Sequence, residues 1–407
     1  MRSVHILGST GSIGTQCLEV VAANGSCYRV ASLTAGGANL SLLARQVAKF
    51  RPERVGIASG DELDFRQCLA EVSGSSYAHS VDLLVGPDAS AEVAARASVD
   101  DVVLNGITGG VGLGSTLAAL RAGATLALAN KESLVEGGPL VEKAMVRPGQ
   151  IVPVDSEHSA IAQCLRSGVH ERGLTSPVLT GRSEVSKLIL TASGGPFRGA
   201  SRKQLANVTV DQALQHPTWN MGPVVTINSS TLMNKALELI EAHLLFDVAP
   251  EDIIPVVHPQ SRIHSAVRWM DGSTVMQSSP PSMKIPIALG LSWPERLCDV
   301  ANPDVFDEPF ALTFEPVDSE VFPALELARY AARKGEGTPA VMNAANEVCV
   351  DRFRRGMCGF LDIVDTVASV CEQYCPSNIY TVEDLDEVTR WACVRADELL
   401  GDSSWDR

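Results

Sequence analysis

Two carboxylates stand two residues apart in the segment 152–158 (VPVDSEH), directly after an apolar run. In an extended chain, the side chains of Asp155 and Glu157 point to the same side. Two like charges held together are costly unless a cation lies between them, and hard cations such as Mg²⁺ prefer carboxylate oxygens. The same residues also fit the start of a helix, with an Asp or Ser N-cap and a Glu in the first turn. This segment alone does not decide between a metal site and a helix cap.

A third carboxylate lies in the apolar stretch 230–246, where Asn234 and Glu238 are one helical turn apart and Lys235 stands beside them. An amide, an ammonium group and a carboxylate at this spacing share one side of a helix and can contact a phosphate, a hydroxyl and a metal ion together. The common alternative is an exposed helix with a Lys–Glu ion pair. Only the combination with the carboxylates of 152–158 favours a metal site.

The segment 8–14 (GSTGSIG) follows an apolar run and opens a helix-like stretch. Glycines let a pyrophosphate approach the backbone closely, and the helix N-terminus that follows offers free N–H groups. A tight turn without a ligand is the alternative. An NAD site would place an acidic residue near 32–39 (SLTAGGAN), and none is present there. This absence favours NADPH, although the stretch has no basic residue either.

Three further polar residues stand where elements are expected to meet. Lys131, between Asn130 and Glu132, follows the strand-like run 125–129, and ligands bind at the carboxyl ends of strands. Ser193 enters a Gly-Gly turn whose N–H groups can hold a phosphate oxygen. Ser229 belongs to a hydroxyl cluster (227–231, INSST) that we place at the N-terminus of the long helix, where it caps the helix or binds an anion. A solvated ion pair, a plain turn and a simple cap are the alternatives.

The stretch 216–222 (HPTWNMG) carries His216, Trp219 and Met221 between a Pro and a Gly. This composition predicts a loop that closes over a ligand and excludes water. We expect the loop to be mobile without substrate and ordered with it. The alternative is a fixed loop with Trp219 in a small core.

The elements that must position these residues alternate in type over the first 155 residues. Strand-like runs are expected at 4–7, 28–33, 54–58, 81–85, 102–105 and 125–129, with helices such as 13–23 and 40–50 between them. This rhythm predicts an α/β fold with a Rossmann-like, doubly wound parallel sheet. We assign 1–155 to an NADPH-binding domain. Residues 156–292 form a central α+β catalytic domain with the metal site, the substrate site and the lid. A linker at 293–320 and a C-terminal helical bundle at 321–407 complete the chain.

The bulk composition limits the partners. The formal net charge of −15 argues against nucleic acid and anionic membranes, which select basic faces. No apolar run approaches the roughly 18 residues that span a bilayer. Met1 is followed at once by a strand pattern rather than a signal peptide. The ten cysteines form no C-x-x-C pair, so we expect reduced thiols and a cytoplasmic protein.

Eight blocks of the sequence resemble, in order, the motifs of the 1-deoxy-D-xylulose 5-phosphate reductoisomerase family. They are 8–14, 128–133 (LANKES), 153–158 (PVDSEH), 191–197, 216–222, 233–238 (MNKALE), 258–261 (HPQS) and 343–347 (NAANE). The match runs from residue 4 to about residue 350. The resemblance implies a homodimeric oxidoreductase that uses NADPH and a divalent metal, Mg²⁺, Mn²⁺ or Co²⁺. Its implied product is 2-C-methyl-D-erythritol 4-phosphate, an intermediate of non-mevalonate isoprenoid synthesis.

The resemblance also implies roles for individual residues. The metal ligands are Asp155, Glu157 and Glu238, and these three with Lys131 and His216 form the catalytic set. The substrate contacts are Lys131, Ser156, Glu157, Ser193, His216, Trp219, Met221, Ser229, Asn234, Lys235 and Glu238. The cofactor contacts are Thr10, Gly11, Ser12, Ile13, Asn130, Glu132 and Gly222, and the glycine loop and the turn after the second strand add Gly8, Gly14, Gly36 and Asn39. Many family members have a basic residue where this chain has 36–39 (GGAN), so the contact to the 2′-phosphate stays open.

These parts suit the rearrangement and reduction of 1-deoxy-D-xylulose 5-phosphate, a small sugar phosphate. Whether the carbon skeleton rearranges by retro-aldol cleavage or by an α-ketol shift is left open. One alternative is an NADPH-dependent dehydrogenase of another phosphorylated or acidic substrate, without isomerisation. Another is a nucleotide sensor without chemistry. Neither alternative requires the three carboxylates.

Overall fold

The computed structural model describes residues 1–219 and 221–401, and Asn220 of the expected lid and the end of the expected C-terminal domain, 402–407, lie outside it. Its first sheet has seven parallel strands in the order β4-β3-β2-β1-β5-β6-β7. The strands are β1 (Arg2–Leu7), β2 (Tyr28–Ala35), β3 (Arg54–Ile57), β4 (Asp82–Val85), β5 (Val102–Asn105), β6 (Thr125–Leu128) and β7 (Ile151–Pro153). The chain runs outward from β1 in both directions, which confirms the doubly wound sheet.

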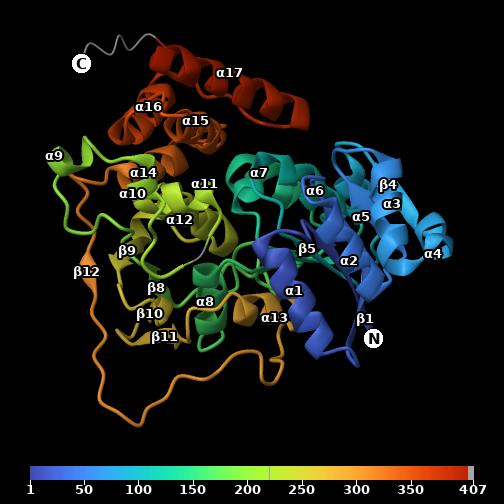
Figure 1. The fold of residues 1–407 in the computed structure, drawn as a ribbon. Helices are drawn as coiled ribbons and strands as arrows, with labels where there is room; N and C mark the ends of the chain where they lie inside the picture. The colour runs from blue at the N-terminus through green and yellow to red at the C-terminus, as the bar shows by residue number, and fades with distance from the viewer. Residues whose placement is uncertain (220, 402–407) are drawn as a thin grey trace.

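Helices cover both faces of this sheet (Figure 1). They are α1 (Ser12–Ala23), α2 (Leu40–Phe50), α3 (Glu62–Ser73), α4 (Ser75–Ser80), α5 (Ala89–Ala95), the 3₁₀ turn η1 (Gly110–Gly112), α6 (Leu113–Arg121) and α7 (Lys131–Ala144). Val102 and Leu104 pack into the core beneath α1 and α2, whereas Val103 between them packs into the core beneath α5 and α6. Because alternate residues enter different cores, the strands read as continuous apolar runs.

A second, mixed sheet has five strands in the order β11-β10-β8-β9-β12. The strands are β8 (Val185–Ala192), β9 (Ile253–Val257), β10 (Ile263–Trp269), β11 (Thr274–Ser278) and β12 (Glu315–Pro316). Its helices and turns are α8 (Ser156–Leu165), α9 (Arg202–Leu205), α10 (Val210–Ala213), α11 (Pro223–Ser230), α12 (Met233–Phe246), the 3₁₀ turn η2 (Pro250–Asp252) and α13 (Lys284–Ser292). Helix α13 returns to the first sheet, where Ile287 and Leu291 join the core beneath α1.

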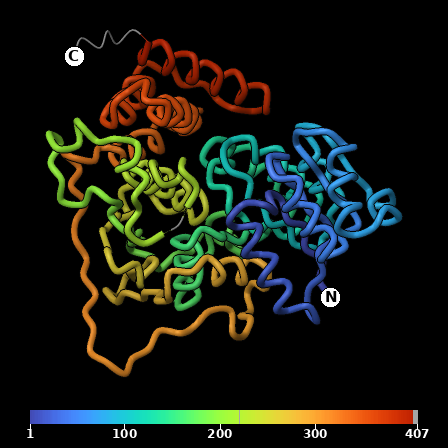
Figure 2. Tube along the Cα trace, in the orientation of Figure 1, coloured from blue at the N-terminus to red at the C-terminus, as the bar shows by residue number. Residues whose placement is uncertain are grey.

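Residues 293–314 contain neither helix nor strand, and they form the long extended trace between α13 and β12 (Figure 2). The chain then forms four helices, α14 (Ala324–Lys334), α15 (Thr338–Arg354), α16 (Phe360–Gln373) and α17 (Val382–Gly401). Helices α15, α16 and α17 lie above α7, α11 and α12 in Figure 1. The expected C-terminal helical region is therefore confirmed within the described residues.

The expected long helix at 230–246 is α12, which begins three residues later at Met233, and a separate helix, α11, precedes it. Pro223 begins α11 at its first turn, and α11 ends at Ser230. Leu232 then adopts a left-handed conformation with φ of 59°, which separates the two helices. The hydroxyl cluster 227–231 therefore lies directly before the long helix, as predicted, and Oγ1 of Thr231 accepts from the backbone N–H of Met233 over 3.3 Å. The same cluster also forms the C-terminal end of α11, which the sequence did not indicate.

The C-terminal helices dock on α7 through a buried polar contact. The Asn343 side chain of α15 donates to Oε1 of Glu136 over 2.6 Å. Burial raises the pKa of Glu136 to about 8, and the neighbouring carboxylates of Glu347 and Glu132 add to this shift. Glu136 is therefore largely protonated at neutral pH.

This shift predicts a loss of stability as the pH rises. The folded-state pKa of Glu136, about 8, lies above the ordinary value of 4.5, so its contribution to stability is complete below pH 4.5 and is lost progressively until the pH passes about 8. Each pKa unit corresponds to about 1.4 kcal/mol. Glu136→Gln keeps the acceptor for Asn343 but cannot ionise. By calorimetry, we expect wild type and variant to melt alike at pH 4, and the variant to melt several degrees higher at pH 9. An equal fall for both proteins between the two pH values would contradict this assignment.

Candidate active site

A cavity of about 750 Å³ lies where the two sheets approach each other. One wall consists of residues that follow β1, β5 and β6, namely Gly11, Thr108 and Ala129. The other wall comes from the end of β8, from α11 and α12, and from the loop before α11. The first wall is the carboxyl edge of a doubly wound sheet, which is where ligands bind in such folds.

Three carboxylates gather at this cavity. One oxygen each of Asp155, Glu157 and Glu238 can be chosen so that all lie within 4.8 Å of one another. Asp155 is the N-cap residue of α8, and Glu157 lies in its first turn. Of the two alternatives left open for this segment, the structure has the helix start, but Asp155 makes no side-chain cap bond, so its carboxylate remains available to the site. Glu238 enters from α12 and is buried.

Two lysines form ion pairs with the three carboxylates. Lys131 Nζ pairs with Asp155 and lies 3.0 Å from both Oε1 of Glu238 and Oδ1 of Asn234. Lys235 Nζ pairs with Glu238 and lies 2.7 Å from Oε1 of Glu157. Both lysines are buried, so the solvated ion pairs that we considered for Lys131 and Lys235 are wrong.

The pKa shifts reflect this crowding. Burial alone would lower the pKa of Lys131, but the charges of Asp155, Glu238 and Glu241 outweigh it and hold the pKa well above the usual range. Burial would raise the pKa of Asp155, but Lys131 and His158 outweigh it and lower that pKa. Burial, with Glu238 nearby, raises the pKa of Glu157 to about 7. The two lysines thus compensate part of the negative charge.

A second layer lies beneath the carboxylates. His158 Nε2 is 2.9 Å from the backbone oxygen of Glu238, and its Nδ1 is 3.2 Å from Oε2 of Glu241. Both side chains are almost fully buried, and neither lines the cavity. His158 therefore connects the first turn of α8, which carries Glu157, to the turn of α12 that carries Glu238.

Asp155, His158 and Glu241 also bring one ligand atom each within 4.8 Å of one another. The two possible ligand sets share Asp155. The set with Glu157 and Glu238 borders the cavity, whereas His158 and Glu241 are sealed from it and already contact each other. A metal ion that must contact a substrate is therefore better served by Asp155, Glu157 and Glu238.

A serine and a histidine face the carboxylates across the cavity. Nδ1 of His216 accepts hydrogen bonds from the backbone N–H groups of Thr218, over 3.1 Å, and Trp219, over 2.8 Å. Its proton must then be on Nε2, which lies 3.0 Å from Oγ of Ser193 and donates to it. Burial lowers the pKa of His216, which favours this neutral form.

The Gly-Gly turn brings Ser193 close to the end of α11. Gly195 has φ of +63°, and a Cβ there would lie 2.9 Å from the backbone oxygen of Ser229. Glycine is thus required both by the left-handed conformation and by the close approach. The result is that Ser193 and Ser229 line the same cavity.

Comparisons with known proteins find matches to one and the same enzyme along nearly the whole chain. Residues 4–138 match the family model described as 1-deoxy-D-xylulose 5-phosphate reductoisomerase, and residues 151–246 and 278–394 match models of C-terminal domains of the same enzyme. The reductoisomerase of Beutenbergia cavernae is 54% identical over 403 residues, covering 98% of each chain. That of Paenarthrobacter aurescens is 53% identical over 405 residues, covering 99% of each chain.

The chain belongs to the 1-deoxy-D-xylulose 5-phosphate reductoisomerase family.

Solved structures of this family have the same fold. The reductoisomerase from Zymomonas mobilis in complex with NADPH superposes with a TM-score of 0.85 at 38% identity, covering 98% of this chain and 99% of that one. A reductoisomerase in complex with NADPH, fosmidomycin and magnesium superposes with a TM-score of 0.86 at 34% identity, covering 98% of each chain.

Most of the residues that we predicted for the reductoisomerase site line this one cavity. They are Gly11, Ser12, Ile13, Lys131, Glu132, Asp155, Ser156, Glu157, Ser193, His216, Trp219, Met221, Gly222, Ser229, Asn234, Lys235 and Glu238. They come from segments more than 200 residues apart at the extremes, between Gly11 and Glu238. The expected lid residues Trp219 and Met221 are half-buried, and the ring of Trp219 contacts His264 edge-on with centroids 6.2 Å apart.

Other predicted cofactor residues do not line the cavity, namely Gly8, Thr10, Gly14, Gly36, Asn39 and Asn130. Their predicted cofactor contacts stay predictions, and several of them have structural roles as well. A Cβ on Gly14 would lie 2.4 Å from the backbone oxygen of Gly8, so this glycine lets α1 approach the loop. Asn39 and Asn130 are N-caps of α2 and α7, and Asn130 also donates to Glu132 over 2.9 Å.

Some residues of the site were missed. Gln16, Thr108, Ser282 and Met283 line the cavity, and His158 and Glu241 lie beneath the carboxylates. The first four carry no chemical signal in the sequence. The pair His158 and Glu241 offered one: each stands on a helix within three residues of a predicted metal ligand.

The cross-link through His158 predicts an effect on metal affinity. Asn in place of His158 cannot reach both the Glu238 backbone and Glu241, so Glu157 and Glu238 should lose their relative placement. Residues that orient metal ligands typically contribute 10–100-fold to affinity. We expect His158→Asn to weaken Mn²⁺ binding by about this factor, measured by electron paramagnetic resonance of free Mn²⁺.

A matched control exists in the same region of the chain. His170 also bridges two elements, with Nε2 2.7 Å from the backbone oxygen of Phe246 and Nδ1 2.8 Å from Ser183, but it touches none of the three carboxylates. His170→Asn should leave Mn²⁺ affinity unchanged. Equal affinities in wild type and both variants would exclude the cross-linking role of His158.

Proposed function

We propose that this chain catalyses the NADPH- and divalent-metal-dependent rearrangement and reduction of 1-deoxy-D-xylulose 5-phosphate to 2-C-methyl-D-erythritol 4-phosphate. The observation that carries the proposal is the cluster of the partly buried Asp155 and Glu157 and the buried Glu238 beside a cavity at the carboxyl edge of the first sheet. The relatives named above are reductoisomerases along their whole length, and structural neighbours are complexes with NADPH and with magnesium. A simple dehydrogenase would have no use for the three carboxylates.

The residues present fit a hard divalent cation. Three carboxylates face two ammonium groups, so one negative charge remains uncompensated in a buried place. Mg²⁺ and Mn²⁺ prefer such oxygen ligands, and we assign Asp155, Glu157 and Glu238 as the groups that would hold the ion. When bound there, the ion would polarise the oxygens of the substrate and stabilise the negative charge that develops during rearrangement.

The chain's own residues bind and orient the substrate. We assign Ser193, Ser229, Asn234 and Lys235, with His216, to the phosphate and hydroxyl groups, because all five line the cavity. Lys131, fixed by Asp155 and Asn234, would donate to a substrate oxygen. The neutral imidazole of His216 offers its Nε2 proton on the side of Ser193.

The cofactor would approach along the first wall. Gly11, Ser12 and Ile13 at the start of α1 line the same cavity as Lys131 and Glu132, so a dinucleotide there would end beside the substrate. We propose NADPH rather than NADH, because the turn 36–39 carries no carboxylate to repel a 2′-phosphate. The neutral N-cap Asn39 and the following α2 lie at that turn.

Turnover of NADPH tests the function. We expect oxidation of NADPH with 1-deoxy-D-xylulose 5-phosphate, slower oxidation of NADH, and loss of both when a chelator removes the metal. Glu238→Gln removes one charge but nearly preserves shape, so kcat should fall by at least 100-fold while the fold and the NADPH dissociation constant persist. Near-normal turnover of Glu238→Gln would refute the ligand assignment.

We further propose that residues 216–222 close over the substrate. Trp219 and Met221 line the cavity, and burying them removes apolar surface from water at about 25 cal/mol per Å². Ordering a segment of this length costs roughly 1–2 kcal/mol per residue, a term of similar size. A bound substrate should therefore decide between the open and closed loop.

Hydrogen exchange over 214–222 measures this closure. We expect slower exchange when a non-reactive substrate analogue and Mg²⁺ are both present than when neither is. Identical exchange in both states would mean that the loop is fixed and that Trp219 is a core residue.

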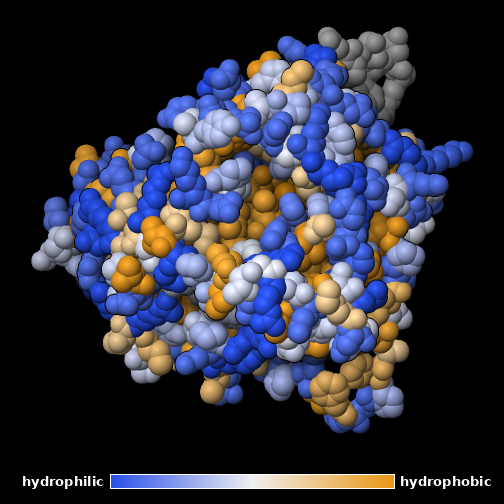
Figure 3. All heavy atoms as spheres, turned by 180° about the vertical axis from the view of Figure 1, so that it is seen from behind, coloured by the Kyte–Doolittle hydropathy of each residue, from blue (hydrophilic) through white to orange (hydrophobic). Residues whose placement is uncertain are grey.

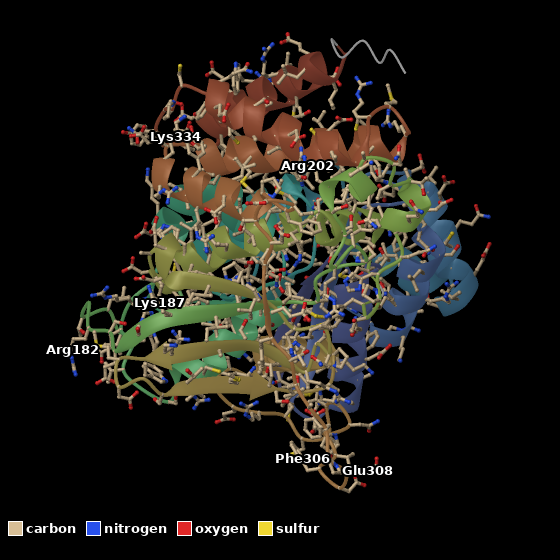
Figure 4. All side chains as sticks on the ribbon, turned by 90° about the vertical axis from the view of Figure 1, so that its left-hand side faces the viewer. Arg182, Lys187, Arg202, Phe306, Glu308 and Lys334 are labelled. Carbon is tan, nitrogen blue, oxygen red and sulfur yellow. The ribbon has the colours of Figure 1, made fainter. Side chains whose placement is uncertain are left out.

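We also propose a homodimer and a cytoplasmic location. The segment 293–314 carries exposed large side chains, among them Phe306, Phe310 and Val305. Phe306 points away from the body at the tip of this segment (Figure 4), and hydrophobic atoms gather on the protruding end seen from behind (Figure 3). A second copy of the chain would cover them. If so, Phe306→Asp should dissociate the dimer to monomers, which light scattering measures.

The ten cysteines are free, in keeping with a reducing compartment. Every described helix is too short or too polar to cross a membrane.

A further inference from the structure

Helix α15 carries the NAANE segment 343–347, yet none of its residues lines the cavity. Two amide side chains of this segment, Asn343 and Asn346, are almost fully buried. Each points from α15 to a different helix of the active site. The function proposed above assigns no part to either of them.

The first amide contacts α7. Nδ2 of Asn343 donates to Oε1 of Glu136 over 2.6 Å and lies 3.2 Å from Oε1 of Glu347. Glu347 in turn accepts from the backbone N–H of Gly110 over 3.4 Å. Helix α7 begins with Lys131 and Glu132, which line the cavity. Asn343 therefore fixes the helix whose first turn faces the substrate.

The second amide contacts α11. Nδ2 of Asn346 donates to Oδ1 of Asn228 over 3.0 Å, and both side chains are buried. Asn228 directly precedes Ser229, which lines the cavity, and α11 directly follows the loop 216–222. Asn346 thus holds the helix that presents Ser229.

Stability alone does not explain this amide. Oδ1 of Asn346 has no hydrogen-bond partner among the described residues, although it is buried. Such an unpaired group typically costs about 1–3 kcal/mol, and a leucine of similar size would avoid that cost. The unpaired oxygen of Asn346 lowers stability, whereas its amide nitrogen makes a directional bond to Asn228. This combination indicates that Asn346 serves to place Asn228.

We propose that Asn343 and Asn346 are positioning residues, which hold α7 and α11 from behind so that Lys131 and Ser229 face the substrate together. The C-terminal helices would thereby act on the reaction without contacting any reactant. This inference rests on the proposed function, because it assigns Lys131 and Ser229 to the same substrate.

The test is the variant Asn346→Leu. Leucine keeps the volume and removes the unpaired oxygen of Asn346, but it also leaves Oδ1 of Asn228 without its donor. These two effects on stability oppose each other, so the melting temperature should stay nearly unchanged. The KM for 1-deoxy-D-xylulose 5-phosphate should nevertheless rise about tenfold, since α11 loses its fixed position. The NADPH dissociation constant, measured by nucleotide fluorescence, should stay within twofold, because Asn346 contacts the C-terminal half of α11, whereas the predicted cofactor contact Gly222 precedes its first turn.

Two further variants separate positioning from general damage. Asn228→Leu should raise KM similarly, and the double variant should be no worse than either single one, because all three lose the same bond. Phe353→Leu weakens the same helix through its contact with Phe360, whose ring centroid is 5.9 Å away, and should lower the melting temperature without changing KM. If Asn346→Leu folds poorly, Asn346→Ser takes its place, and its KM for 1-deoxy-D-xylulose 5-phosphate should likewise rise about tenfold.

An unchanged KM in Asn346→Leu, or an equal rise in Phe353→Leu, would overturn the positioning role. Absence of turnover in the wild type would instead refute the proposed function. The two failures are therefore distinguishable.

Discussion

Five charged side chains in a largely enclosed cluster impose the strongest constraint on this structure. Asp155, Glu157 and Glu238 lie within reach of one ion, and Lys131 and Lys235 pair with them from two sides. Burying charges is expensive unless each has a partner in good geometry. The carboxylates exceed the lysines by one charge, so loss of either lysine would increase the imbalance, whereas a bound cation would offset it.

The fold satisfies this constraint by bringing three helix ends to one place. Lys131 begins α7, Asp155 caps α8, and Glu238 lies in the second turn of α12. Helix α7 follows a strand of the first sheet, whereas α12 packs with the second sheet, so the cluster exists only when the two sheets are correctly docked. His158 joins α8 to α12 directly beneath the charges, and Asn343 joins α7 to the C-terminal helices. Polar contacts thus specify a register that the apolar cores alone would leave less defined.

The sequence predicted the fold well where a local pattern decides the structure. Strands β5 and β1 are β-branched runs flanked by turn residues, and their place in a doubly wound sheet follows from alternation with helices. The long helix begins at Met233 rather than at Ser230, because Leu232, an ordinary helix former, adopts a left-handed conformation that the local sequence does not indicate. For Asp155 and Glu157 the sequence left an extended chain and a helix start open, and the structure has the helix start, with α8 beginning at Ser156.

The site was predicted as a set of residues but not as a geometry. The glycine loop, the carboxylates and the lysines stand out by type and spacing. The contact of Lys131 with Glu238 joins residues 107 positions apart, and nothing local indicates it. The same holds for Asn346 and Asn228, whose bond joins the C-terminal helices to the active site. Gly8 and Gly14 were predicted for their place in a phosphate-binding loop, which stays a prediction, and they also allow close packing of backbone around that loop.

The central claim is that the buried carboxylates form one divalent-metal site on the cavity. Anomalous diffraction at the manganese absorption edge, from crystals grown with Mn²⁺, tests it most directly. The account predicts a single strong peak per chain in contact with Asp155, Glu157 and Glu238. A peak between Asp155, His158 and Glu241 instead, or no peak near Asp155 at saturating Mn²⁺, would contradict it.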